Sequence, residues 1–397
     1  MFQLPYYPRL PFELLHEIID ILGGRIHEDD SLQALRSCLM VSRAFRHFSR
    51  RHIFGIVHVS PSPPALDPGY MSSEITTRLS NLRQLIDALD GIGPYITTFN
   101  ITQRYDEAST FDTEDLVAVI SQLAASGTKL EKIVFGGMVD CDVEWPSLSM
   151  EFKVAFHRLI SSRPLQDLEL RNIAGLPDYI LRGVLVEKIT LHEIEPDFSE
   201  EDSVLLEKVQ IGHRPYPVPR SISTDLSCML YLADSTQDCL SAIPLNLKTL
   251  ALTVDMDNGL NLVWDILTRT KDFVEDLTLC FYGTPLPSLP HASILTVIPG
   301  PDIPFEEIVS FDFGALKHLR RLNVVCEMGE INGSSLIRNV IGDLLQTATS
   351  ARSLECLHLV VTWKISRLKT KSYFFEVGKR DWKCIKDLLA RKVQVFP

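Results

Sequence analysis

The sequence predicts an α/β protein in which a short helical module precedes a long region of alternating strands and helices. Residues 10–54 carry helical apolar periodicity, and an apolar strand pattern then recurs along most of the remaining chain. The length of 397 residues suits one short module followed by one large domain. With 45% hydrophobic and 23% charged residues, the composition is that of a globular protein and excludes a largely disordered chain.

The first predicted helix covers residues 10–22, with the sequence LPFELLHEIIDIL. Pro11 suits a first helical turn, and Glu13 lies near the positive end of the helix dipole. Gly23 and Gly24 then predict the end of the helix. Apolar residues recur at helical spacing, namely Leu14, Leu15, Ile18, Ile19 and Leu22.

Two more helices are predicted between Ser31, a candidate N-cap, and Phe54. Their apolar residues are Leu32, Leu35, Cys38 and Leu39, followed by Val41, Phe45, Phe48, Ile53 and Phe54. A bundle of about 45 residues has too little interior to bury all of them. We therefore expect the surplus apolar surface to contact a neighbouring domain or a partner.

The runs LPFELLHEII, LQALRSCLMVSRAFR and RRHIF resemble the F-box, in the style of F-box proteins of basidiomycete fungi. The resemblance implies docking onto the Skp adaptor of a cullin–RING ubiquitin ligase. Two departures are the acidic insertion 23–30 and Phe45, which stands where many members carry Trp. The resemblance points to ten adaptor-binding residues, which are Leu10, Pro11, Leu14, Leu15, Ile18, Ile19, Leu35, Cys38, Val41 and Phe45.

The pattern L-x-x-L-x-L, with any large apolar residue allowed, recurs nine times after the helical module. Each copy contains a short strand with alternating apolar residues. The copies start at Ile96, Leu130, Leu165, Val186, Leu206, Leu247, Val274, Leu319 and Leu354. Helical patterns between them cover residues 115–126, 151–162, 261–270 and 335–348.

Stacked strands joined by variable return segments predict an irregular leucine-rich-repeat-like solenoid with one parallel sheet. In that arrangement Leu170, Leu191, Leu252, Leu279 and Leu359 form one apolar column. The alternative is an ordinary α/β domain with the same strands in a different order. The Asn ladder of regular repeats is absent.

These patterns predict four segments: a helical module at 1–58, a Pro-rich linker at 59–73, the repeats at 74–363 and a C-terminal cap at 364–397. The last segment carries ten Lys and Arg against three Asp and Glu. A basic docking surface is the alternative interpretation of this segment.

No phosphate-binding glycine loop and no G-x-S-x-G elbow occurs, and the histidines are scattered. The sequence therefore predicts no catalytic residue, no metal site and no cofactor. A non-catalytic ubiquitin-ligase adaptor is the function that the resemblance implies. Two alternatives stay open: an F-box scaffold without ubiquitination, and an α/β enzyme whose active-site residues are distant in sequence.

Target recognition is predicted in three long loops after strands, at 136–149, 212–220 and 282–304. Aromatic residues in these loops are of the kind enriched at interfaces. Together with residues that point out of the strands, the candidates are Trp145, Tyr216, Tyr282, His291, Asn323 and His358. The alternative is that these are ordinary surface loops.

The net charge of −12 argues against nucleic acid as the main partner. No apolar run is long enough for a membrane helix, and no secretory signal is visible. The eight cysteines form no C-x-x-C pair and are interpreted as reduced thiols. We therefore expect a cytoplasmic or nuclear protein whose partners are a Skp-type adaptor, a cullin and an unidentified target protein.

Overall fold

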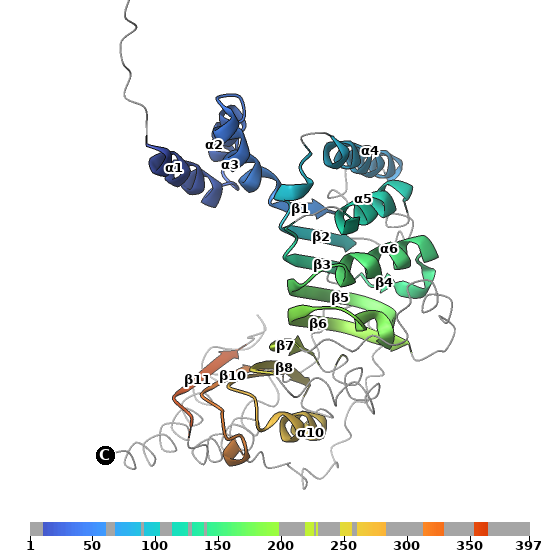
Figure 1. Ribbon diagram of the computed structural model, residues 1–397. Helices are drawn as coiled ribbons and strands as arrows, with labels where there is room; N and C mark the ends of the chain where they lie inside the picture. Colours follow the sequence, from blue (N-terminus) through green and yellow to red (C-terminus); the bar gives the residue numbers. More distant parts are fainter. Residues whose placement is uncertain are drawn as a thin grey trace, which may run out of the picture. The chain divides into compact units, whose positions relative to one another are not determined.

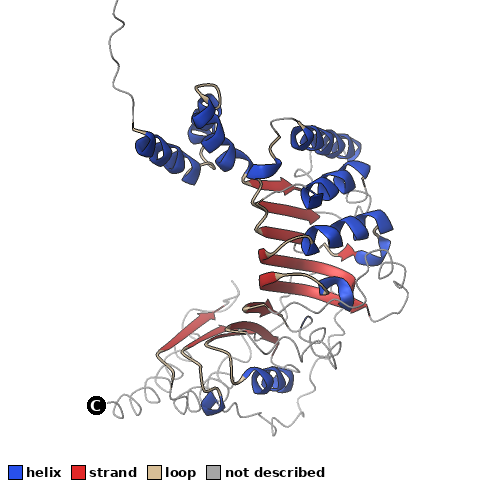
Figure 2. Ribbon diagram, in the orientation of Figure 1, coloured by secondary structure: helices blue, strands red, loops and turns tan. Residues whose placement is uncertain are grey.

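A computed structural model describes residues 11–60, 68–88, 91–103, 113–125, 129–138, 141–197, 219–225, 228, 247–255, 260–282, 313–328 and 353–363. In these ranges the chain combines helices with a single sheet of 11 strands (Figures 1 and 2). The strands follow chain order, β1-β2-β3-β5-β6-β7-β8-β9-β10-β11, and β4 pairs with β5 off this path. Every strand pair with a defined register is parallel.

The chain divides into two compact units. The first comprises residues 1–136 and 147–165, and the second comprises 137–146 and 166–397. The helices and strands of the first unit are α1 (Phe12–Gly24), α2 (Asp29–Cys38), α3 (Arg43–Phe54), β1 (Ile56–Val59), α4 (Pro68–Asp87), β2 (Thr98–Gln103), α5 (Glu114–Ala125), β3 (Lys132–Gly137) and α6 (Met150–Ser161), with the short 3-10 helix η1 (Gly93–Tyr95) before β2.

Those of the second unit are β4 (Val143–Glu144), β5 (Leu165–Pro177), β6 (Val186–Asp197), β7 (Ser221–Thr224), β8 (Thr249–Asp255), α10 (Leu260–Thr270), β9 (Asp276–Tyr282), β10 (Arg321–Met328) and β11 (Cys356–Trp363). Short 3-10 helices follow β5 (Asp178–Leu181) and precede β10 (Phe313–Ala315), and another, Trp145–Ser147, follows β4.

The helices α5, α6 and α10 form where the sequence predicts them. Helix α5 buries its predicted stripe completely, at Leu116, Val119, Ile120 and Leu123. In α6, the Ser149 hydroxyl accepts the N–H of Phe152 and caps the helix. The rings of Phe152 and Phe156 then pack against Phe135 of β3, with centroids 5.6 and 4.7 Å away.

In the second unit, the register confirms the predicted apolar column for four of its five leucines. Leu252 lies beside Leu279, and Val324 lies between Leu279 and Leu359. Thr224 occupies the same row between Leu191 and Leu252. Leu170 of β5 is also fully buried.

One strand of the second unit, β7, is not among the nine predicted copies. Its sequence from Pro219 keeps the spacing of the pattern, with buried Ile222 and Thr224 at the fourth and sixth positions. Pro and Thr replace large apolar residues, so the pattern search misses it. The copy predicted at 206–211 lies outside the described residues.

In the segment 136–149, Trp145 is not the exposed interface residue that the sequence predicts. Residues Val143 and Glu144 pair with β5, and Val143, Trp145 and Leu148 are all buried. The prediction for Trp145 was wrong because burying the large apolar surface of its ring stabilises the folded chain more than exposing the ring to water.

At the N-terminal end, α3 leads directly into the sheet. After Phe54, the single residue Gly55 connects the helix to β1, which pairs with β2. The Gly55 carbonyl accepts three hydrogen bonds, from the N–H groups of Thr97 and Thr98 and from the Thr97 hydroxyl, at 2.9, 2.9 and 3.0 Å. The sheet therefore begins before the Pro-rich stretch 59–73, and α4 begins within that stretch at Pro68.

Several predicted features lie outside the described residues. They are residues 61–67 of the Pro-rich stretch, residues 212–218 and 283–304 of two predicted loops, the predicted helix 335–348, and the basic segment 364–397. None of the helices in the part of the chain that the structure describes has both the length and the apolar character needed to cross a membrane.

Candidate protein-interaction surface

The three-helix module of α1, α2 and α3 has a small core. Leu15, Ile19 and Leu35 form it, with at most 8% of any of these residues exposed. Partly buried side chains surround this core, namely Leu22, Ile26, Ala44, Phe45, Phe48 and Ile53. The Ser42 hydroxyl caps α3 by accepting the N–H of Phe45 at 3.3 Å.

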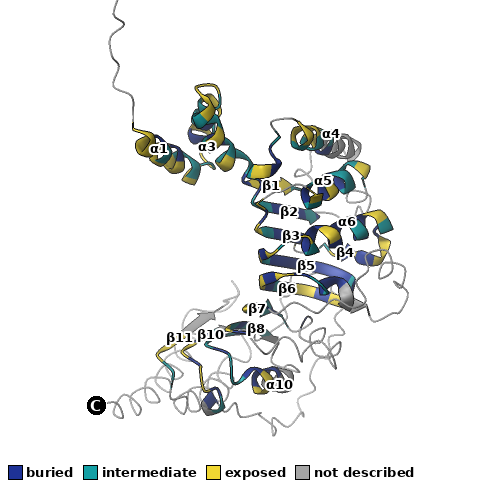
Figure 3. Ribbon diagram, viewed as in Figure 1, coloured by how far each residue is buried: buried dark blue, intermediate teal, exposed yellow. Residues whose placement is uncertain are grey.

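Helix α1 carries a second apolar stripe that faces away from this core. Leu14, Ile18 and Ile21 follow the spacing i, i+4, i+7 and are 46%, 47% and 56% exposed. Phe12, at the start of the helix, is 57% exposed. Exposed and buried residues alternate around α1 in Figure 3. An amphipathic helix that only caps a core has no need of two apolar stripes.

The turn between α2 and α3 adds two exposed apolar side chains. Met40 is 82% exposed and Val41 is 63% exposed. We call these two residues, together with Phe12, Leu14, Ile18 and Ile21, the apolar surface of the module. It comprises six of the eleven large apolar side chains that are exposed within the described ranges.

The structure divides the described adaptor-binding candidates into three groups: exposed, half-buried and interior residues. Pro11, Leu14, Ile18 and Val41 are exposed, whereas Cys38 and Phe45 are half-buried. Leu15, Ile19 and Leu35 form the interior of the module, and Leu10 lies outside the described residues.

Sequence reasoning missed three members of the apolar surface: Phe12, Ile21 and Met40. The helical spacing from Leu14 and Ile18 could have identified Ile21. Phe12 and Met40 carry no such signal, because they lie at the first turn of a helix and in a turn.

Aromatic contacts hold the module together and join it to η1, which precedes β2. The ring of Phe48 contacts Phe12 and His16, with centroids 5.4 and 4.6 Å away. On the neighbouring face of α3, His47 Nδ1 lies 3.1 Å from the Tyr95 hydroxyl of η1, and the Arg50 guanidinium lies 6.0 Å from the Tyr95 ring centroid. The orientation of α3 against η1 and β2 is thus supported by side chains as well as by Gly55.

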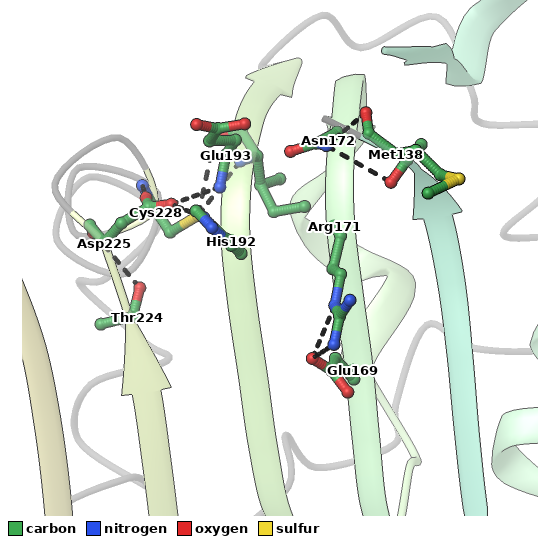
Figure 4. A network of polar contacts seen from close by, with 11 residues as sticks. Met138, Glu169, Arg171, Asn172, His192, Glu193, Thr224, Asp225 and Cys228 are labelled. Atoms are coloured by element: carbon green, nitrogen blue, oxygen red, sulfur yellow. Dashed lines mark hydrogen bonds and ion pairs between the residues drawn. The ribbon is translucent and has the colours of Figure 1, made fainter. Parts of the chain in front are cut away.

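A polar network links the middle of β6 to the residues that follow β7 (Figure 4). Asp225 accepts hydrogen bonds from the ring Nδ1 of His192 at 2.7 Å and from the backbone N–H of Glu193. Its other oxygen accepts the N–H of Cys228 at 3.1 Å. The hydrogen bond to Asp225 raises the pKa of His192, while desolvation opposes the shift.

The same network continues on β5. The side-chain amide of Asn172 donates to the carbonyl oxygens of Gly137 and Met138, at 3.3 and 2.8 Å. Asn172 and Glu193 both have positive φ angles, of 47° and 51°. The Cys228 thiol is fully buried and accepts the N–H of Ile194, within β6. The Cys228 thiol is therefore not accessible as a nucleophile.

The structure brings two of the predicted target-binding residues together, because Asn323 of β10 and His358 of β11 are paired in the parallel register. Trp145 is buried, Asn323 donates to the Thr278 hydroxyl at 3.2 Å and is half-buried, and His358 is exposed. Tyr282 is the last residue of β9. Tyr216 and His291 lie outside the described residues.

No group of three or more His, Cys, Asp and Glu side chains that could hold a metal ion is found among the described residues. A search against models of known protein families gives no match, and no curated protein matches the sequence. The apolar surface of the module is therefore the feature on which a functional argument can rest.

Proposed function

We propose that this protein is a substrate-recognition adaptor of a cullin–RING ubiquitin ligase, acting in the cytoplasm or nucleus. In this proposal the helical module is an F-box that binds a Skp-type adaptor, and the strands form a leucine-rich-repeat-like region that binds the target. The observation that carries the proposal is the second apolar stripe of α1, which leaves Leu14, Ile18 and Ile21 exposed.

The energetics favour a protein partner for this stripe. Burying one large apolar side chain contributes roughly 1.5–3 kcal/mol. The module fully or nearly fully buries only three such side chains in its own core, so it has little interior to offer. Apolar side chains of an amphipathic helix that its own domain leaves exposed are commonly buried in an apolar groove of a partner protein.

The repeat region supports the second half of the proposal. Parallel strands in chain order, with one apolar column at matching register, are what stacked repeats produce. A doubly wound α/β domain reverses its strand order at a switch point, and no such reversal occurs among the described strands. We therefore assign a binding role to this region in preference to an enzymatic one.

The test replaces Leu14 and Ile18 by Asp and measures binding to a purified Skp-type adaptor. Binding should be lost, while the circular dichroism spectrum and melting temperature stay the same because both side chains are already exposed. The matched control is Leu85→Asp, which changes a 47% exposed leucine on α4. Adaptor binding by the double variant at the level of the wild type would refute the proposal.

A further inference from the structure

Helix α3 presents a basic face to solvent. Arg43, His47 and Arg51 are exposed and follow one another at intervals of four residues, so they lie on the same side of the helix. They span about 12 Å along the axis, given the rise of 1.5 Å per residue. We call these three residues the basic face of α3.

This face carries positive charge in an otherwise acidic protein. The net charge is −12, yet the sequence contains no Asp or Glu from Ser31 to Leu66. Arg43 and Arg51 make no ion pair with any residue that the structure describes. The histidine between them contacts the neutral hydroxyl of Tyr95.

Exposed basic residues of the strand region behave differently. Lys248 pairs with Glu275 at 2.8 Å, and Arg320 pairs with Glu355 at 2.8 Å. Two oxygens of Asp276 accept from Arg321, at 2.5 and 2.6 Å. There the chain supplies its own carboxylates, whereas on α3 the described chain supplies one to His52, through Asp20, and none to Arg43 or Arg51.

The basic face continues from the apolar surface of the module. Met40 and Val41 are exposed immediately before Ser42, which caps α3, and Arg43 is the first residue of the helix. A partner that covers Met40 and Val41 therefore comes within reach of Arg43. One binding partner can contact both surfaces.

We propose that the basic face of α3 binds an acidic segment of the Skp-type adaptor that covers the apolar surface. This inference rests on the proposed function. Guanidinium groups pair well with carboxylates, in a planar geometry with two parallel hydrogen bonds. Nucleic acid and anionic membranes fit less well, because the face is only about two turns long and the whole protein repels polyanions.

Charges at the rim of an interface act mainly on the rate of association and on its salt dependence. The experiment measures adaptor binding by surface plasmon resonance at 50 and 300 mM NaCl, with the full chain. For Arg43→Glu/Arg51→Glu, the association rate at low salt should fall by about tenfold, and the salt dependence seen in the wild type should flatten.

Two controls make the result specific. The variant Arg43→Lys/Arg51→Lys keeps the charge and should retain most of the association rate. The variant Arg158→Glu reverses an exposed arginine on α6 and should behave like the wild type. The melting temperature of every variant should equal that of the wild type. The variant Arg43→Gln/Arg51→Gln removes the charge without reversing it, so its association rate should fall by less than that of the Glu variant.

The failure of this inference is distinguishable from failure of the proposed function. If the wild type does not bind the adaptor, the proposed function fails and this inference fails with it. If the wild type binds and the Glu double variant keeps its association rate and salt dependence, only the basic face is misassigned. A double variant that loses affinity for a single-stranded oligonucleotide but not for the adaptor also overturns the inference.

Discussion

The helical module and the strand region differ in how completely they bury their apolar side chains. In the strands, Leu250, Leu252, Leu277 and Leu279 are each no more than 1% exposed. In the module, three of the six large apolar residues from Leu14 to Leu22 are buried or half-buried, whereas Leu14, Ile18 and Ile21 are exposed. The difference shows which region closes its own core and which has apolar surface left for a partner.

The two regions also differ in whether their basic side chains pair with carboxylates of the same chain. Neighbouring strands place Lys248 and Glu275, and then Arg320 and Glu355, side by side at the strand starts. Helix α3 places Arg43 and Arg51 where no described carboxylate meets them. The module thus combines exposed apolar side chains with arginines that pair with no described carboxylate. The strand residues named above show neither feature, because their leucines are buried and their basic side chains are paired.

The largest expected effect sharpens the contrast in burial. Leu279→Ala removes a fully buried side chain from the apolar column and should lower the free energy of unfolding by about 2–5 kcal/mol. Ile18→Ala removes a 47% exposed side chain and should change it by about 0.5 kcal/mol or less. Urea denaturation of both variants measures the difference, and equal losses would break the comparison.

A smaller effect is expected where the two regions join. A Cβ atom added at Gly55 would lie 2.5 Å from the Arg51 carbonyl oxygen, too close without a shift of the backbone. Gly55→Ala should therefore lower the free energy of unfolding by about 1–3 kcal/mol. The measurement is again urea denaturation.

Thr97→Val is the matched control at this junction. It removes the hydroxyl that donates to the Gly55 carbonyl at 3.0 Å but leaves the two backbone hydrogen bonds in place. The expected loss is about 1 kcal/mol. A Gly55→Ala variant as stable as the wild type would show that the helix and the first strand are not tightly coupled there.

The sequence predicted the parallel sheet of the strand region well because burial there follows simple periods. Helix α5 buries the predicted stripe, and the predicted column appears in the register around Leu279. Strand β7 escaped because Pro219 and Thr224 occupy apolar positions of the pattern. Trp145 was predicted at an interface because the sequence alone does not distinguish an exposed aromatic residue of a long loop from a buried one.

The module was harder to predict for a physical reason. Leu14 and Leu15 are adjacent, lie 100° apart around the helix and are both leucine, so sequence does not say which one faces the core. The same holds for Ile18 and Ile19. Three-dimensional packing assigns Leu15 and Ile19 to the interior, and only then does the remaining stripe become recognisable as a surface.

The smallest expected effect concerns pH and belongs to the strand region alone. His192 faces Asp225 and Glu193, with Arg171 as the opposing positive charge, and its pKa in the folded protein is raised above the ordinary 6.5. A raised pKa means that the protonated ring is stabilised by folding. The contribution is therefore fully present below about pH 6.5 and is lost as the pH rises through the folded-state pKa.

The variant His192→Gln isolates this contribution because glutamine does not titrate. The free energy of unfolding should be measured for both proteins by urea denaturation between pH 5.5 and 8.5. The wild type should gain most over the variant at the acidic end, by about 1 kcal/mol or less because the histidine side chain is 56% exposed. The advantage should shrink towards pH 8.5, as the pH rises through the raised pKa of His192. A difference that stays constant, or grows with pH, would mean that the hydrogen bond to Asp225 ties β6 to β7 without depending on the charge of His192.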